Sequence, residues 1–217
     1  MNIVSLNSKH WETMAEKGLK REVLVDTITQ ALNEAATHLP PLSPHLNIVI
    51  SPDQEASIPE TGDMGFTWDD ELIDIYFDPT LPFGTESLLK NLRSTAFHEL
   101  NHAARGVVIP FETTPTEALV SEGLATHFDK QYTGTQALWG IYEDDATMQA
   151  WLEEVLALPS GQKHPEYLFD HSDGRRWIIY KTGTWIVDRV MAEGHISLKD
   201  LTVLPAQEIL NLLPSAT

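Results

Sequence analysis

Residues 98–102 of the chain read His-Glu-Leu-Asn-His, which is the H-E-x-x-H pattern of catalytic zinc sites. Two histidines with this spacing lie one above the other on the same face of a helix. Their ring nitrogens can therefore reach one metal ion at about 2.0–2.1 Å. Glu99 is rotated off that face, where its carboxylate can bond to a water molecule instead of the metal. The pattern predicts that His98 and His102 bind zinc and that Glu99 acts as a general base.

The residues around this motif have the pattern of an amphipathic helix. Thr85 and Glu86 follow Gly84 and are typical of a helix start with an acidic first turn. Arg105 and Gly106 are typical of a helix end. Between them, apolar residues recur at helical spacing: Leu89, Leu92, Ala96, Leu100 and Ala103. We therefore expect a helix of about 20 residues that buries one face and turns its histidines toward a cleft.

A catalytic zinc ion needs a third protein ligand and an open position for water. The chain has no cysteine, so this ligand must be Glu, Asp or a distant His. Glu122 is the best candidate, because it lies beside Gly123 in an otherwise apolar run where an unpaired carboxylate would be costly. Glu117 is the main competitor, but residues 114–117, Thr-Pro-Thr-Glu, have the pattern of a capping box, which gives Glu117 a structural role. His127 and Asp129 remain as further alternatives.

A second group is expected opposite the metal, to help stabilise the oxyanion that forms during hydrolysis. Tyr180, His171 and His164 are the candidates. Tyr180 precedes Gly183 by three residues, and a glycine there would allow another helix to approach closely. A core tyrosine with a local hydrogen-bond partner is the alternative interpretation of Tyr180, and a surface histidine is that of His171.

The motifs together resemble the gluzincin metallopeptidases. HELNH at residues 98–102, followed by Glu122, has the gluzincin arrangement. More closely, HELNHAARG at 98–106 and TEALVSEGLATHF at 116–128 resemble a bacterial family of predicted zinc-dependent proteases of unknown function. The similarity runs from about Leu46 to the C-terminus. It implies a zincin-like fold with His98, His102 and Glu122 on the metal and Glu99 as base, and a Y-x-x-G element of that family favours Tyr180 as the oxyanion-stabilising residue.

The composition is typical of a globular protein and restricts its partners. The chain has 217 residues, 42% of them hydrophobic, and a formal net charge of −18. Nucleic acid and anionic membrane surfaces require basic patches, so neither is an expected partner. The N-terminus lacks the basic and apolar regions of a secretory signal, and no run approaches the roughly 20 apolar residues of a membrane span. We therefore expect a cytoplasmic protein. From the metallopeptidase resemblance, we expect its substrate to be a peptide or a protein.

The order of the predicted elements favours an α+β fold within a single domain, 1–217. An amphipathic helix over residues 20–39 and short strands over 46–50 and 72–77 occupy the part up to about residue 84. The two helices that carry the predicted zinc ligands begin a mainly helical part, about 85–217, with further helices near 142–158 and 175–192. Strands first and helices later, with few strands in all, indicate a small sheet with an active-site helix.

The predicted strand Leu72–Phe77 has two interpretations. In zincins an edge strand beside the active-site helix pairs with the extended substrate, and Leu72–Phe77 precedes the predicted zinc helix. It is equally well an ordinary strand inside the sheet, because a sequence does not identify an edge.

The sequence as a whole predicts a zinc-dependent peptide-bond hydrolase of the gluzincin type, with Zn²⁺ as its cofactor. The alternative is a zinc-binding regulatory or interaction protein that has the fold and cleaves nothing. Glu99 argues against that alternative, because retention of a metal does not require a base beside it.

Overall fold

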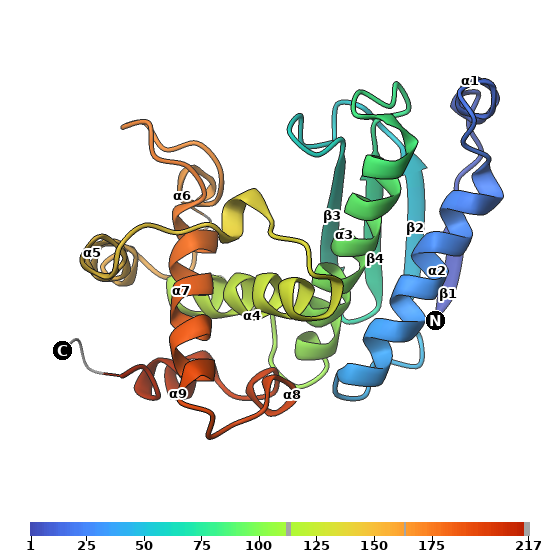
Figure 1. Cartoon of the computed structure of the whole chain (residues 1–217). Coiled ribbons are helices and arrows are strands. Elements are labelled where there is room, and N and C mark those ends of the chain that lie inside the picture. The colour runs from blue at the N-terminus through green and yellow to red at the C-terminus, as the bar shows by residue number, and fades with distance from the viewer. Residues whose placement is uncertain (112–113, 163, 215–217) are drawn as a thin grey trace. The chain divides into compact units, whose positions relative to one another are not determined.

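The computed structural model describes residues 1–111, 114–162 and 164–214. The chain divides into two compact units, Met1–Val107 and Val108–Thr217. The first unit contains the sheet, and the described part of the second is helical (Figure 1). The predicted α+β class, with a small mixed sheet followed by a helical C-terminal half, is confirmed.

Within the described residues, the first unit contains a four-stranded mixed sheet in the order β1-β2-β4-β3. The strands β1 (Asn2–Ser5), β2 (Asn47–Pro52) and β4 (Leu72–Phe77) run parallel to one another. The remaining strand, β3 (Asp63–Asp69), pairs antiparallel with β4 and forms one edge of the sheet. A two-residue turn, Asp70-Glu71, joins β3 to β4 and continues the acidic stretch that begins at Asp69, the last residue of β3.

Leu72–Phe77 therefore lies inside the sheet, between β2 and β3, and its interpretation as a substrate-pairing edge strand is wrong. The edge strand next to β4 is β3. The first residues of β3 have the polar composition of a turn, and the sequence did not identify them as a strand. The strand within 46–50 is confirmed, as β2, and β1 was not predicted from the sequence.

The sheet has one face covered by helices. Both α2 (Arg21–His38) and α3 (Gly84–Gly106) lie across it, as Figure 1 shows, and they pack against each other. Side chains alternate between the two faces of a strand, so the covered face collects every second residue. Those from β2 and β4 are fully buried hydrophobic residues: Ile48, Ile50, Ile73, Ile75 and Phe77. The paired residues of β3 that share this face are Asp63, Gly65 and Thr67.

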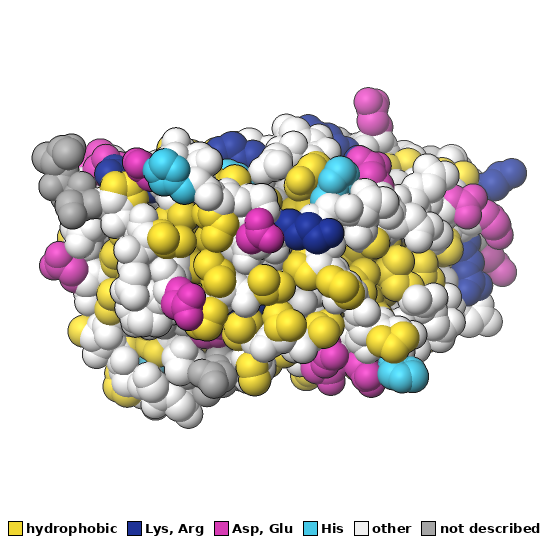
Figure 2. All heavy atoms as spheres, turned by 90° about the horizontal axis from the view of Figure 1, so that it is seen from below, with side chains coloured by type: hydrophobic (Ala, Val, Ile, Leu, Met, Phe, Trp, Pro, Cys, Tyr) yellow, Lys and Arg dark blue, Asp and Glu magenta, His cyan; other side chains and the backbone are white. Residues whose placement is uncertain are grey.

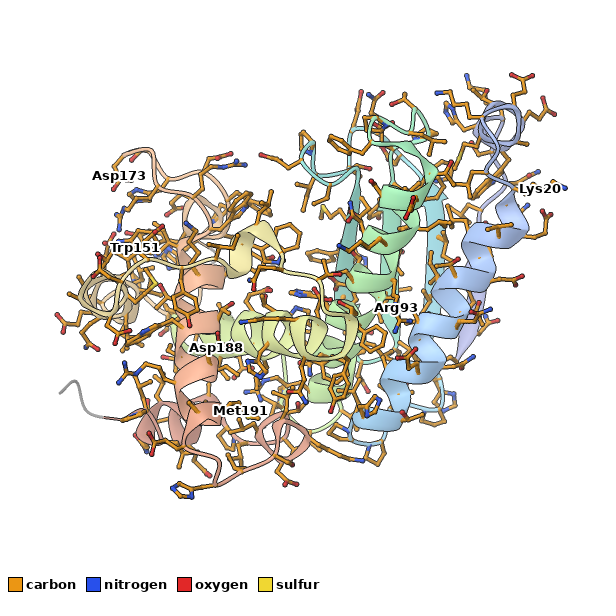
Figure 3. The ribbon with its side chains drawn as sticks, viewed as in Figure 1. Lys20, Arg93, Trp151, Asp173, Asp188 and Met191 are labelled. Carbon is orange, nitrogen blue, oxygen red and sulfur yellow. The ribbon has the colours of Figure 1, made fainter. Side chains whose placement is uncertain are left out.

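Ion pairing also joins α2 to α3. Arg93 of α3, labelled in Figure 3, donates to Glu34 of α2 at 2.8 Å and stacks over the ring of Phe97. This hydrogen bond holds the pKa of Glu34 below its usual value. A further short helix, α1 (His10–Glu16), precedes α2 and contacts it.

In the second unit, α4 (Pro115–Thr133) and α7 (Ile178–Ala192) form the central pair, and α7 crosses α4 (Figure 1). The crossing places backbone against backbone. A Cβ atom on Gly183 would lie 2.0 Å from the Leu119 carbonyl oxygen, and one on Gly123 would lie 2.2 Å from that of Gly183. The close helix approach expected at Gly183 is present, and it positions the middle of α4, where Glu122 lies.

A polar network also links α4 to α7. The Asp188 carboxylate of α7, labelled in Figure 3, lies 2.5 Å from His127 Nδ1 and accepts from Lys130 and the Tyr142 hydroxyl at 3.3 and 3.1 Å. Burial by itself would raise the pKa of Asp188. The hydrogen bond and charge of His127 and the charge of Lys130 lower it by more, so the pKa of Asp188 lies below its usual value. Burial and the Asp188 charge raise the pKa of Tyr142 to about 12.

Smaller elements complete the second unit: η1 (Leu138–Gly140), α5 (Asp145–Leu156), α6 (Pro165–Leu168), α8 (Leu198–Leu201) and α9 (Ala206–Asn211). The acidic residues 143–145 start α5, where the Asp144 carboxylate caps the helix by accepting from Thr147 N–H at 3.0 Å. The helices predicted near 142–158 and 175–192 are confirmed as α5 and α7. Among the described residues, no helix is both long and apolar enough to cross a membrane.

Candidate metal centre

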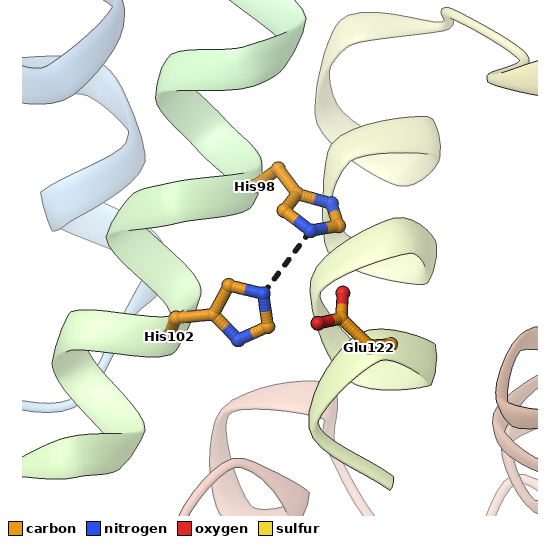
Figure 4. A group of neighbouring side chains, drawn as sticks. All are labelled: His98, His102 and Glu122. Carbon is orange, nitrogen blue, oxygen red and sulfur yellow. Dashed lines mark hydrogen bonds between the residues drawn. The ribbon is translucent and has the colours of Figure 1, made fainter. Parts of the chain in front are cut away.

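The two histidines of the H-E-x-x-H pattern lie on α3 and face each other. His98 and His102 are buried, with 7% and 8% of their surfaces exposed, and their Nε2 atoms are 3.1 Å apart (Figure 4). Two nitrogen ligands at 2.0–2.1 Å from one tetrahedral zinc ion would lie about 3.3 Å apart. The imidazole pair therefore already has a spacing that suits a shared metal ion.

Helix α3 carries His98 and His102. Charged residues at its two ends favour the helix, and buried apolar residues hold one of its faces in the core. Glu86 lies in its first turn and Arg105 in its last, each with the charge that the helix dipole favours. Leu92, Ala96 and Leu100 are fully buried. The predicted helix is confirmed, and His102 and His98 lie about one and two turns before its last residue, Gly106.

Glu122 supplies a carboxylate to the same group of side chains. It lies in the middle of α4 and is half-buried, one residue before the close contact of Gly123 with α7. One ligand atom from each of His98, His102 and Glu122 can be chosen so that all three lie within 4.8 Å of one another (Figure 4). Two imidazoles and one carboxylate are a ligand set typical of catalytic zinc.

The competing carboxylates and histidine do not belong to this group. The Thr114 hydroxyl caps α4 by accepting from the Glu117 N–H at 3.1 Å, which is one of the two hydrogen bonds of the predicted capping box. His127 is engaged with Asp188, and Asp129 accepts from the Thr133 hydroxyl at 2.8 Å. Thus the Glu117 N–H and the Asp129 carboxylate have partners within α4 or its cap, and His127 has its partner on α7.

Glu99 lies one residue after His98 and is directed at the edge strand of the sheet. Its side chain is buried, with 6% of its surface exposed. The Thr67 hydroxyl of β3 donates to Glu99 Oε2 at 2.7 Å and lies 3.1 Å from the Glu99 carbonyl oxygen. Gly65 leaves the space that the side chain occupies, because a Cβ there would lie 2.2 Å from Glu99 Cγ. Sequence reasoning missed both β3 residues.

The three candidates for the oxyanion-stabilising residue have different surroundings. Tyr180 is half-buried in the first turn of α7, with its ring centroid 6.1 Å from that of Trp139. His171 pairs with Asp173 at 2.8 Å, and His164 Nε2 lies 2.9 Å from the Pro159 carbonyl oxygen. The two histidines thus have local structural partners in the loops around α6.

His98, His102 and Glu122 thus form a group of side chains that could hold a metal ion. Comparison with protein families agrees: residues 24–211 match the model of the family described as "Predicted Zn-dependent protease (DUF2268)". The match covers most of the chain, which therefore belongs to this family. No curated protein and no solved structure matches the chain.

Proposed function

We propose that this protein is a zinc-dependent peptide-bond hydrolase of the gluzincin type. The observation that carries the proposal is the group formed by His98, His102 and Glu122, with the Glu99 carboxylate next to it in the sequence. The family description, a predicted zinc-dependent protease, supports the same class of activity.

In this proposal His98, His102 and Glu122 hold the ion, and Glu99 moves the proton. Zinc, when bound, supplies Lewis acidity that acidifies water and polarises a carbonyl group. The Thr67 hydroxyl donates to Glu99 Oε2, so Oε1 takes a proton from the attacking water and later delivers it to the leaving amine nitrogen. The hydroxyl of Tyr180 donates a hydrogen bond to the oxygen of the scissile carbonyl as negative charge develops there.

The substrate in this proposal is an extended peptide, and β3 replaces Leu72–Phe77 as the strand that pairs with it. An edge strand presents backbone N–H and C=O groups that an added strand can bind. β3 is the edge strand that contacts α3, the helix with the H-E-x-x-H motif. Nucleic acid is not a partner in this proposal, because the chain carries a formal charge of −18.

Metal analysis and peptide cleavage on matched variants test the proposal. We expect a single zinc ion per chain, lost in His98→Ala, His102→Ala and Glu122→Ala and retained in Glu117→Ala, which is the matched carboxylate control on α4. Glu99→Gln should keep its zinc and its fold but lose hydrolysis, because an amide does not accept the proton from water.

Each part of the proposal has its own contradicting result. Zinc loss from Glu117→Ala but not from Glu122→Ala would reject the ligand assignment. Full activity of Glu99→Gln would reject the general base. A parent protein that binds zinc and cleaves nothing in a broad peptide library would favour the regulatory or interaction protein instead.

A further inference from the structure

The edge strand β3 contacts the proposed base through two of its residues. Thr67 donates a hydrogen bond to the Glu99 carboxylate, and Gly65 leaves room for it. We propose that Thr67 and Gly65 are positioning residues, which fix the Glu99 carboxylate against β3 so that its second oxygen is free to accept a proton. The catalytic purpose of this contact rests on the proposed function, whereas the contact itself does not.

The hydrogen bond from Thr67 orients the carboxylate. A carboxylate has two oxygens, and Thr67 Oγ1 occupies one of them, Oε2, at 2.7 Å. The hydroxyl has a single proton, and a charged carboxylate binds it more strongly than the neutral Glu99 carbonyl oxygen at 3.1 Å. Because Glu99 is buried, such a bond also offsets part of the cost of keeping its charge away from water. The bond therefore holds one oxygen and leaves Oε1 available.

The clearance at Gly65 fixes how close the carboxylate lies to the strand. A Cβ on Gly65 would lie 2.2 Å from Glu99 Cγ and 2.5 Å from Oε1, distances that two such atoms never adopt. The atoms in the way belong to a flexible side chain and not to backbone. Alanine at this position would therefore displace the Glu99 side chain from its place against β3.

The geometry of β3 brings both residues to the same side. Gly65 and Thr67 are two residues apart and face α3, whereas Phe66 and Trp68 face away and stack edge to face with ring centroids 4.7 Å apart. The pairing of β3 with β4 becomes irregular directly after Thr67, between Thr67 and Asp69. Bulges of this kind occur beside active sites, where they direct particular side chains.

The contact is tested first without zinc or substrate. In metal-free protein, Thr67→Val should lower the urea midpoint of unfolding, and this shift should shrink when Glu99 is already alanine. Thr95→Val is the matched control, because the Thr95 hydroxyl of α3 donates to the Asp63 carboxylate of β3 at 2.6 Å. Its shift should be the same whether or not Glu99 is present. Equal shifts of Thr67→Val in the two backgrounds would overturn the inference, even if the protein proves to be a peptidase.

The positioning role is then tested by steady-state kinetics with a peptide substrate. Thr67→Val should lower kcat by about 10- to 100-fold, as loss of a supporting hydrogen bond commonly does, with KM and zinc content unchanged. Thr67→Ser, which keeps the hydroxyl, should restore most of kcat, and Thr95→Val should behave as the parent. A kcat of Thr67→Val equal to that of Thr95→Val would overturn the role.

Gly65→Ala gives an independent test if Thr67→Val folds poorly. Gly65→Ala keeps the Thr67 hydroxyl but removes the space that Glu99 occupies, so it should lower kcat. Gly65→Ala with the kcat of the parent would also overturn the inference. An inactive parent with an intact Thr67–Glu99 coupling would instead reject the proposed function and leave the contact established.

Discussion

The position of Tyr180, the proposed oxyanion-stabilising residue, is set by the helix on which it lies, α7. Tyr180 lies three residues before Gly183, the point where α7 contacts α4, and Glu122 lies one residue before Gly123 on the other side of that contact. The same helix crossing therefore fixes the backbone on which each residue stands. Of the three candidates for the oxyanion-stabilising residue, Tyr180 is the one that stands on α7, whereas His171 and His164 lie in the loops around α6.

Replacement of Tyr180 by phenylalanine removes only the hydroxyl and leaves the ring to pack against Trp139. If that hydroxyl donates to the developing oxyanion, its loss acts mainly on the transition state. We expect kcat to fall by about 10²–10³, with little change in KM and unchanged zinc content. Steady-state kinetics and thermal unfolding on the same sample measure both quantities. A near-normal kcat with about 0.5–1.5 kcal/mol of lost stability would identify Tyr180 as a structural residue.

At the scale of elements, the crossing of α4 and α7 depends on two glycines. Helix propensity alone predicts that Gly183→Ala stabilises α7 by about 1 kcal/mol. The structure predicts the opposite sign, because the added Cβ would meet the Leu119 carbonyl oxygen at 2.0 Å, and backbone does not move aside cheaply. We expect a net loss of about 1–3 kcal/mol in urea unfolding, typical of overpacking.

The Gly123→Ala variant provides the internal control for this crossing. Its Cβ would meet Gly183 itself, so the two substitutions affect one contact and should be less than additive when combined. A Gly183→Ala protein more stable than the parent would show that α4 and α7 pack less closely than described.

Local signals in the sequence predicted α3 and α4 well, and β3 was missed for a physical reason. The H-E-x-x-H spacing and the cap at Thr114 depend on neighbouring residues only. In β3, the usual pattern is inverted: Phe66 and Trp68 are exposed on the open face, while Gly65 and Thr67 face the helix. The inward residues serve Glu99 and not an apolar core, so a search for alternating apolar residues finds the wrong face.

The ligand set shows the same division between local and distant information. His98 and His102 follow from the spacing on one helix, and Glu122 from the absence of any capping role in an apolar run. The contact between Thr67 and Glu99 joins residues far apart in the chain, in a pairing that no local pattern encodes. Sequence reasoning could therefore propose the residues of the candidate metal group, but it could not reach the contacts that Glu99 makes with β3.

At the scale of the whole molecule, acidic residues exceed basic ones by a wide margin, 32 against 14. On the face drawn in Figure 2, Lys and Arg side chains do not gather into one broad patch. Ion pairs engage several of the basic residues locally: Arg93 pairs with Glu34, and Arg175 pairs with Glu154 at 2.7 Å. The carboxylates that have no basic partner repel one another, and this repulsion lowers the stability of the folded state.

This excess of negative charge predicts how salt affects stability. Raising NaCl from about 0.01 M to about 0.1 M shortens the screening length from about 30 Å to about 10 Å. Repulsion between distant carboxylates is then screened more than the short ion pairs are, so the Tm at neutral pH should rise. Thermal unfolding in NaCl and in KCl at equal ionic strength measures the effect and controls for specific ions. A Tm that falls with both salts would mean that the ion pairs outweigh the repulsion.

The alternation of side chains along β3 also limits which changes in chain length this protein tolerates. A single residue inserted or deleted within Asp63–Thr67 would exchange the two faces of part of the strand. Phe66 would then be turned toward α3, at the place where even a methyl group is too large. Substitutions on the open face leave that alternation intact. Over evolutionary time, β3 is therefore expected to vary in composition on its open face while its length stays fixed.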